Sequence, residues 1–194
     1  MANKIIFIVG MTGSGKSIVS DELVKKGFAY VRFGQITMDE IKKRGLEINE
    51  TNEKAVREGL RKEHGMGAFA TLNIPKFDGL LKTSNVVGDG LYSWTEYKIL
   101  KEKYGDLMNV VAVFAPPKLR YQRLENRAVE GDVDSRFRSI PEGKSKSRDY
   151  AEIENIEKGG PIAMADFTIV NTGTVEDLKN QLNDFLAHID NDKH

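Results

Sequence analysis

The chain has 194 residues, of which 40% are hydrophobic and 30% charged, and its 29 Lys and Arg residues balance its 29 Asp and Glu residues. This composition predicts one folded domain over residues 1–194, with no general attraction for nucleic acid or anionic membranes. The lack of cysteine excludes disulfides, thiolate metal sites and a cysteine nucleophile, and no apolar run approaches the about 18 residues that span a bilayer. We therefore expect a cytoplasmic protein.

The strongest feature follows the first predicted strand. Residues 4–9 (KIIFIV) form an apolar run too short for a helix, and residues 17–26 place apolar side chains on one helical face. Between them, residues 10–17 read GMTGSGKS and match the pattern G-x-x-x-x-G-K-[ST] at every fixed position. Because a P-loop requires strand, glycine-rich loop and helix in this order, the segment predicts a nucleotide phosphate site.

The residue types of this loop suit that chemistry. Gly13 and Gly15 let backbone amides converge on phosphate oxygens, and the following helix adds its N-terminal dipole. We expect Lys16 to contact the β and γ phosphates of ATP, and the Ser17 hydroxyl to complete the ligand shell of Mg²⁺. The predicted cofactor-binding residues of the loop are Gly10, Met11, Thr12, Gly13, Ser14, Gly15, Lys16 and Ser17.

The next part of the chain predicts a strand and three helical segments. The strand covers residues 28–33, and the helical segments cover residues 37–45, 51–64 and 68–81. Thr37 and Glu40 have capping-box spacing, so Thr37 is expected to start its helix. Pro75 is expected to end or kink the last helical segment.

Strands and helices alternate in the rest of the chain. Strands are predicted over residues 84–89, 107–115 and 166–170. Helices are predicted over residues 93–104, 118–128, 148–158 and 174–189, with a polar loop over residues 129–147. Ser93 and Glu96 have the spacing of a capping box at the start of the first of these helices. Because these strands are apolar without alternation, the pattern indicates an α/β fold, a parallel sheet covered by helices on both faces.

A candidate metal ligand ends the strand at residues 84–89. In P-loop proteins an acidic residue at the end of a neighbouring strand holds the Mg²⁺ shell, and Asp89 occupies such a position. We predict Ser17 and Asp89 as the metal-binding residues. The alternatives are a simple turn aspartate in Gly-Asp-Gly, or Glu96 or Asp78 as the ligand.

Residues 118–148 are rich in basic side chains. They contain nine Lys and Arg residues and five Asp and Glu residues, a net charge of +4. Arg120, Arg123 and Arg127 are spaced to share one helical face. A cationic segment of this kind is typical of a lid that neutralises a transferring phosphoryl group, and the alternative is a solvated helix with surface ion pairs.

These features give nearly the whole chain a resemblance to the P-loop kinases of the nucleoside monophosphate kinase group, which includes dephospho-CoA kinase. The likeness is greatest to an uncharacterised family described as adenylate-kinase-related. It rests on the segments GMTGSGKS, FGQIT, LRKEHG, Asp89-Gly90 and SRDYAEIENIEKGGPIAMADFTIVNTGT. It implies the three-layer P-loop NTPase fold with a five-stranded parallel sheet, a helical substrate-binding insert near residues 34–81 and a short lid near residues 129–147.

The resemblance also implies roles for individual residues. Arg123 and Arg127 would face ATP, Arg148 would reach the transferring phosphate, and Asn171 would border the adenine. With Lys16 and Asp89, the three arginines form the predicted catalytic set.

Departures from the resembled families bear on the acceptor. Adenylate kinases carry Gly-Asp-x-x-Arg and Asp-Gly-x-Pro-Arg, whereas this chain reads GQITM at residues 34–38 and DGLYS at residues 89–93, so both arginines that clamp a monophosphate are missing. We expect Arg32, Arg57 or Arg61 to bind the substrate instead. Dephospho-CoA kinases place an aspartate near the end of the second strand, where this chain has Gly34-Gln35. A phosphate acceptor needs no general base, which favours a phosphorylated acceptor.

The sequence thus predicts an ATP- and Mg²⁺-dependent phosphotransferase acting on a small, nucleotide-like, phosphorylated substrate. The alternatives are a dephospho-CoA kinase-like activity, or a nucleotide-dependent switch or slow ATPase whose state a protein partner recognises. The chain has no Asn-Lys-x-Asp guanine motif, which disfavours a GTPase, and its zero net charge disfavours an RNA-end kinase.

Overall fold

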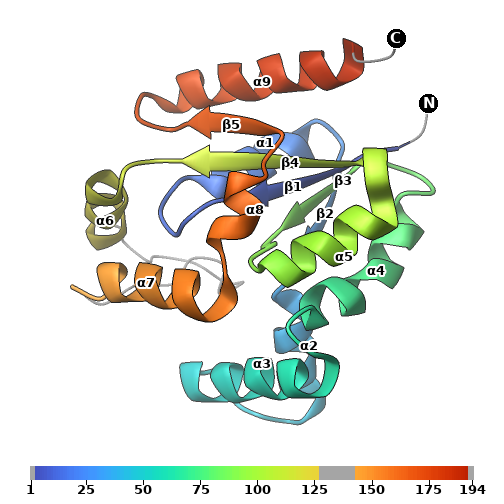
Figure 1. Cartoon of the computed structure of the whole chain (residues 1–194), viewed down its shortest axis with the longest axis vertical. Coiled ribbons are helices and arrows are strands. Elements are labelled where there is room, and N and C mark those ends of the chain that lie inside the picture. Colours follow the sequence, from blue (N-terminus) through green and yellow to red (C-terminus); the bar gives the residue numbers. More distant parts are fainter. Residues whose placement is uncertain (1–2, 127–142, 192–194) are drawn as a thin grey trace.

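The computed structural model describes residues 3–126 and 143–191. Its centre is a five-stranded, wholly parallel sheet with strand order β2-β3-β1-β4-β5 (Figure 1). The strands are β1 Ile5–Val9, β2 Ala29–Arg32, β3 Val86–Asp89, β4 Met108–Phe114 and β5 Phe167–Val170. The prediction of a parallel α/β sheet is therefore confirmed.

Helices cover both faces of this sheet (Figure 1). Their bounds are α1 Lys16–Lys25, α2 Gln35–Lys43, α3 Glu50–His64, α4 Ala68–Leu80, α5 Trp94–Tyr104, α6 Pro117–Glu125, α7 Ser145–Ile156, α8 Gly159–Ala163 and α9 Val175–Asn191, with a 3₁₀ turn at Gly105–Leu107. Helix α3, in the predicted insert, lies farthest from the sheet (Figure 1). Within the described residues, no helix is both long enough and apolar enough to cross a membrane.

The position of β1 at the centre of the sheet explains why its sequence is apolar without alternation. Ile5 and Phe7 belong to a core that α3, α4 and α5 also build, whereas Ile6 and Ile8 belong to a core built with α1 and α9. All four side chains are fully buried. A strand buried on both faces has no solvent side for polar residues, so its sequence reads as a continuous apolar run.

A cluster of three phenylalanines joins β1, the end of β2 and α4. Phe7, Phe33 and Phe77 pack with ring centroids 5.4–5.9 Å apart. Gly88 of β3 makes room for them, because a Cβ there would lie 2.5 Å from the Phe7 ring. This packing fixes the edge of the sheet from which α2 to α4 extend.

The start of α2 differs from the prediction. Thr37 does not start its helix: α2 begins at Gln35, and Thr37 lies within it, 2% exposed. Glu40 cannot complete a capping box there and instead pairs with Arg44 Nε at 2.8 Å. By contrast, Ser93 and Glu96 form the predicted capping box of α5.

Pro75 was expected to end or kink its helical segment. It does not end it, because α4 continues to Leu80, and a kink there stays a prediction. Proline removes one backbone hydrogen bond, but Phe77 beyond it is fully buried in the phenylalanine cluster. Burial of a side chain of this size favours a continued helix.

Two further differences concern the C-terminal part, where α7 begins at Ser145, three residues early, and α8 was not predicted. Most of the predicted lid, with Arg127, lies outside the described residues.

Candidate functional site

The P-loop connects β1 to α1 at the carboxyl edge of the sheet. Three of its residues, Gly10, Gly13 and Gly15, have positive φ angles of 141°, 81° and 103°. A Cβ would collide with the Val113 carbonyl oxygen at Gly10 and with the Asn171 side-chain amide at Gly15. The glycines are therefore required by the backbone conformation and by the packing behind the loop, in addition to the approach of a phosphate.

Asn171 and Arg123 support the loop from behind. Asn171 Nδ2 donates to the Ser14 carbonyl at 2.8 Å, and Arg123 Nη2 donates to the Asn171 carbonyl at 3.1 Å. Asn171 is buried, and neither residue lines the cavity described below. Their predicted contacts with ATP stay predictions, and their observed contacts hold the loop in shape.

A buried ion pair that the sequence did not indicate ties the loop to two helices. Arg120 of α6 donates to the Thr12 carbonyl at 2.9 Å and pairs with both carboxylate oxygens of Asp149 on α7. The two residues are 3% and 5% exposed. The spacing of Arg120 and Arg123 suggested a shared lid-like face, but Arg120 points inward because its partners lie in the core.

A cavity of about 560 Å³ adjoins the P-loop. It is lined by most of the predicted cofactor, catalytic, metal and substrate residues that the structure describes, namely Thr12, Gly13, Gly15, Lys16, Ser17, Arg32, Arg57, Arg61, Asp89 and Arg148. Gly10, Met11 and Ser14 do not line it. The fold therefore brings residues from the P-loop, β2, α3, β3 and α7 to one cavity.

Lys16 occupies a strongly shifted electrostatic environment. Its Nζ donates to the Met11 carbonyl at 3.0 Å. Burial, and then the neighbouring positive charge of Lys158, lower the pKa of Lys16 to about 7. A bound anion at this position would restore the charged form.

The donors at Ser17 and Asp89 fit a magnesium ion. Asp89 accepts a hydrogen bond from the Tyr30 hydroxyl at 2.8 Å through Oδ2. Among the described residues, no three His, Cys, Asp or Glu side chains gather into a metal site of their own. Mg²⁺ is commonly held by one or two protein oxygens together with substrate phosphates and water, so one hydroxyl and one carboxylate suffice.

The two rival acidic residues are engaged elsewhere. Glu96 caps α5 through the Tyr92 and Ser93 amides, and burial raises the pKa of its carboxyl. Asp78 accepts from the Tyr104 hydroxyl at 3.0 Å and pairs with Lys103 at 3.1 Å. Neither lines the cavity.

The candidate substrate arginines differ in their partners. Arg57 pairs with Glu50 at 3.0 Å and with Glu53 at 3.2 Å. Arg61 lies 5.3 Å from the centre of the Phe69 ring, and its buried Nε has no hydrogen-bond partner in the described part of the chain. Burial lowers the pKa of Arg61, and a bound anion would oppose this effect.

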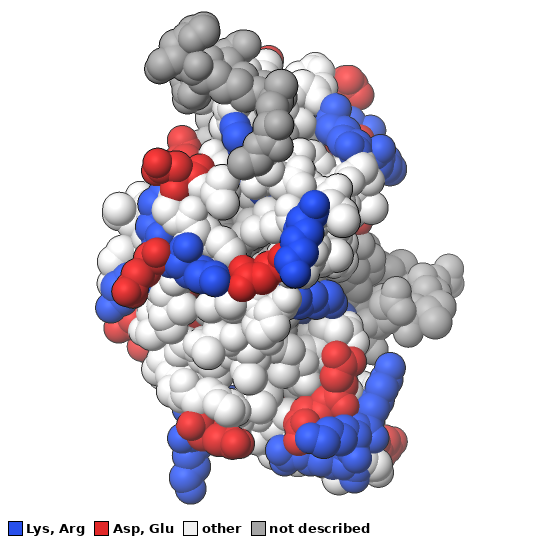
Figure 2. All heavy atoms as spheres, turned by 90° about the vertical axis from the view of Figure 1, so that its right-hand side faces the viewer, with Lys and Arg blue, Asp and Glu red and all other residues white. Residues whose placement is uncertain are grey.

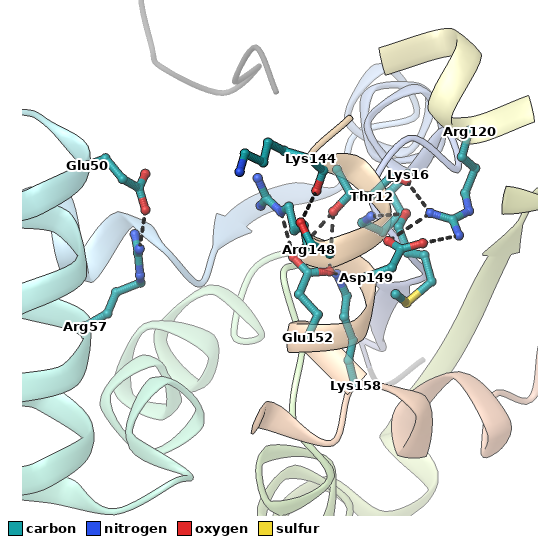
Figure 3. Close-up of polar contacts among 12 residues, drawn as sticks. Thr12, Lys16, Glu50, Arg57, Arg120, Lys144, Arg148, Asp149, Glu152 and Lys158 are labelled. Carbon is teal, nitrogen blue, oxygen red and sulfur yellow. Dashed lines mark hydrogen bonds and ion pairs between the residues drawn. The ribbon is translucent and has the colours of Figure 1, made fainter. Parts of the chain in front are cut away.

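Glu152 and Lys158 are site residues that the sequence reasoning missed. Glu152 of α7 lines the cavity and accepts from Arg148 Nε at 3.0 Å, while the buried Lys158 pairs with the same carboxylate (Figure 3). The spacing of four residues between Arg148 and Glu152 was the available signal for their pairing. No local pattern marked Lys158.

Comparisons with known proteins place this fold and site in a family. A family model described as an AAA domain matches residues 6–153. A UPF0200 protein of Thermococcus kodakarensis is 36% identical over 187 residues, which cover 95% of this chain and 97% of that one.

Solved structures show the same fold at low identity. TT1252 from Thermus thermophilus matches with a TM-score of 0.66 and 18% identity, covering 97% of this chain and 98% of that one. A shikimate kinase from Acinetobacter baumannii, in complex with shikimate, matches with a TM-score of 0.56 and 16% identity, covering 99% and 96%. The chain therefore belongs to the UPF0200 family and shares the fold of these solved structures, one of which is a P-loop kinase.

Proposed function

We propose that this protein transfers the γ-phosphoryl group of Mg-ATP to a small, phosphorylated, nucleotide-like acceptor. The observation that carries the proposal is the single cavity that joins the P-loop to Arg32, Arg57 and Arg61. Hydrolysis of ATP needs only the phosphate half of such a cavity. A second cationic half suits a second anion, because arginine recognises phosphate through bidentate hydrogen bonds.

The residues around the cavity divide the work as follows. Lys16 would stabilise charge on the β and γ phosphates, and Arg148 would neutralise the equatorial oxygens of the transferring group. Ser17 and Asp89 would hold Mg²⁺, which supplies further charge neutralisation when bound. Arg61 is the best placed of the insert arginines for the acceptor phosphate, since Arg57 already has two carboxylate partners.

An acceptor that reacts through a hydroxyl group is the second candidate. Asp89 and Glu152 both line the cavity, and a neutral hydroxyl needs a carboxylate base of this kind. Shikimate kinase, named among the structural neighbours, offers one such acceptor for testing. Dephospho-CoA offers another.

The test is ADP formation from Mg-ATP with a panel of nucleoside monophosphates, dephospho-CoA and shikimate. We expect a rate that depends on one acceptor class. Lys16→Ala serves as the blank and should lose about 3 kcal/mol of transition-state stabilisation, a loss on the order of 100-fold. Full turnover by Lys16→Ala would refute the assignment. The same slow hydrolysis with every acceptor would favour a nucleotide-dependent switch instead.

A further inference from the structure

Three groups converge on the carboxylate of Glu152. Arg148 Nε donates to it at 3.0 Å, the Thr12 hydroxyl of the P-loop lies 3.4 and 3.5 Å from its two oxygens, and Lys158 Nζ pairs with it (Figure 3). Glu152 and Arg148 line the cavity, but Lys158 does not. The cluster therefore has an inner member, Lys158, and an outer member, Arg148.

The contact between Arg148 and Glu152 uses one edge of the guanidinium. It is made through Nε, and the two Nη groups form no hydrogen bond with any described residue. These Nη groups are the donors that remain for a bidentate contact with phosphate oxygens. A bond at Nε fixes the plane of the guanidinium, which a flexible side chain would otherwise have to order on binding.

The buried lysine explains how a carboxylate can stand in a phosphate cavity. Burial lowers the pKa of Lys158, and the Glu152 carboxylate opposes this effect. Glu152 alone would repel ATP, but with Lys158 and Arg148 charged the cluster of three has a net charge of +1. Lys158 is 2% exposed and lies 4.7 Å from the centre of the Tyr92 ring. Burial alone would raise the pKa of Glu152, yet the charges of Lys158 and Arg148 outweigh it and the pKa is lowered. The carboxylate therefore stays ionised and keeps its hold on Arg148.

The supporting helix is itself anchored. Asp149, adjacent to Arg148 in α7, forms the buried pair with Arg120, which also binds the P-loop carbonyl of Thr12. Both α7 contacts, through Asp149 and Glu152, thus reach the same P-loop residue. Such an arrangement fixes a side chain relative to the phosphate site.

We propose that Glu152 is a positioning residue: with Lys158 as its buried counter-ion, it orients the guanidinium of Arg148 toward the transferring phosphoryl group. The inference rests on the proposed function, because it concerns how Arg148 reaches ATP. It adds that Glu152 acts through Arg148 and contributes nothing when that arginine is absent.

A double-mutant cycle tests this dependence. We expect Glu152→Ala to lower kcat by up to about 100-fold with little change in the KM for ATP, since a misplaced group costs most in the transition state. In the Arg148→Ala background the same change should have no further effect. Glu154→Ala, an exposed residue of the same helix, should match wild type. Additive losses, or wild-type kcat in Arg148→Ala, would overturn the proposal.

Glu152→Gln and Arg148→Lys guard against a trivial loss of folding. Glu152→Gln keeps the size of the side chain and should lower kcat in the wild-type background. When residue 148 is changed to lysine, the guanidinium Nε that Glu152 contacts is absent, and Glu152→Gln should have no further effect on kcat. Unfolding midpoints of all variants would be measured in parallel. A drop in kcat that follows the loss of stability and persists with Arg148→Lys would contradict the proposal.

A measurement without an acceptor separates this inference from the proposed function. The slow hydrolysis of Mg-ATP can be followed without any acceptor, and the cycle can be repeated on its rate, because Arg148 would contact the same phosphoryl group in that reaction. Absence of acceptor-dependent turnover would refute the proposed function only. Additivity of Glu152→Ala and Arg148→Ala in both the hydrolysis rate and kcat would refute the inference only.

Discussion

At the scale of single residues, the two arginines of α3 that line the cavity differ in their partners. Arg57 and Arg61 stand four positions apart on α3, and both line the cavity. Arg57 has carboxylate partners on its own helix, whereas Arg61 rests on Phe69 with its Nε unpartnered among the described residues. A bound anion would give the buried Nε of Arg61 the hydrogen-bond partner that it lacks among the described residues.

We therefore expect Arg61→Ala to weaken binding of the acceptor more than Arg57→Ala does. Arg61→Ala should raise the KM of the acceptor by on the order of 10-fold or more, since a charge-assisted hydrogen bond contributes about 1.5–3 kcal/mol. The KM for ATP should stay unchanged in both variants. Steady-state kinetics with each substrate varied in turn would measure both values, and a larger effect of Arg57→Ala would contradict this ranking.

The shifted lysine predicts a pH dependence. Because the pKa of Lys16 falls from 10.5 to about 7 on folding, the unfolded chain carries a proton between these pH values that the folded protein lacks. The free energy of unfolding should therefore rise with pH across this window, as far as Lys16 contributes. Phosphate binding should reverse the shift, so at pH 8 binding of ATP should take up as much as one proton.

Calorimetry in two buffers of different ionisation enthalpy would measure this uptake. The Lys16→Met variant, which keeps the length of the side chain without the charge, serves as the control. Equal proton uptake by the variant and the wild-type protein would show that another group is responsible.

At the scale of elements, α6, α7 and the P-loop are joined by one buried ion pair. Arg120 donates to the Ala115 carbonyl beyond β4, to the Thr12 carbonyl and to Asp149, which also accepts from the Tyr121 hydroxyl. The pair satisfies backbone groups at the ends of two elements. Its role is to fix the orientation of α7, from which Arg148 and Glu152 reach the cavity.

Removing one partner should be more harmful than removing both. Arg120→Met leaves Asp149 buried and unpaired, and we expect it to lower the free energy of unfolding by about 3–5 kcal/mol. Arg120→Met combined with Asp149→Leu should cost less than the sum of the single changes. Urea unfolding would measure all three variants, and strict additivity would argue against a coupled pair.

At the scale of the whole molecule, charges balance overall but not at the site. The formal net charge is zero, and the face shown in Figure 2 mixes basic and acidic side chains without a large field of one sign. The cavity that adjoins the P-loop, in contrast, is lined by six Lys and Arg residues and four Asp and Glu residues, a net charge of +2. Attraction for phosphates is therefore local, and we expect it to act on small anions.

Ligand binding at a cavity lined by several elements should stabilise the entire fold. Mg-ATP at 100 times its Kd adds about 2.7 kcal/mol, which for a chain of this size raises Tm by about 5–10 °C. Thermal unfolding monitored with Mg-ATP would measure the shift. The Tm of Lys16→Ala should rise far less on addition of Mg-ATP. An equal rise in that variant would show that the nucleotide binds elsewhere.

The sequence by itself determined the P-loop and the parallel sheet, because both depend on local order. The phosphate-binding pattern lies entirely within residues 10–17. A strand that is buried on both faces, such as β1, is recognisable from its unbroken apolar run. The α5 capping box was equally local and was predicted correctly. The local signals for a helix start at Thr37 and a helix end at Pro75 were not followed, because tertiary packing outweighed them.

Only the tertiary structure decided which charged side chains meet. Thr12 and Glu152 are 140 positions apart, and Arg120 and Asp149 are 29 apart, so no periodicity relates them. Long charged side chains are normally solvated, and a sequence does not mark the few that are buried. The parallel sheet brings the ends of its strands to one edge. The pairs Arg120–Asp149 and Lys158–Glu152 form there because a buried charge is stable only beside a charge of opposite sign.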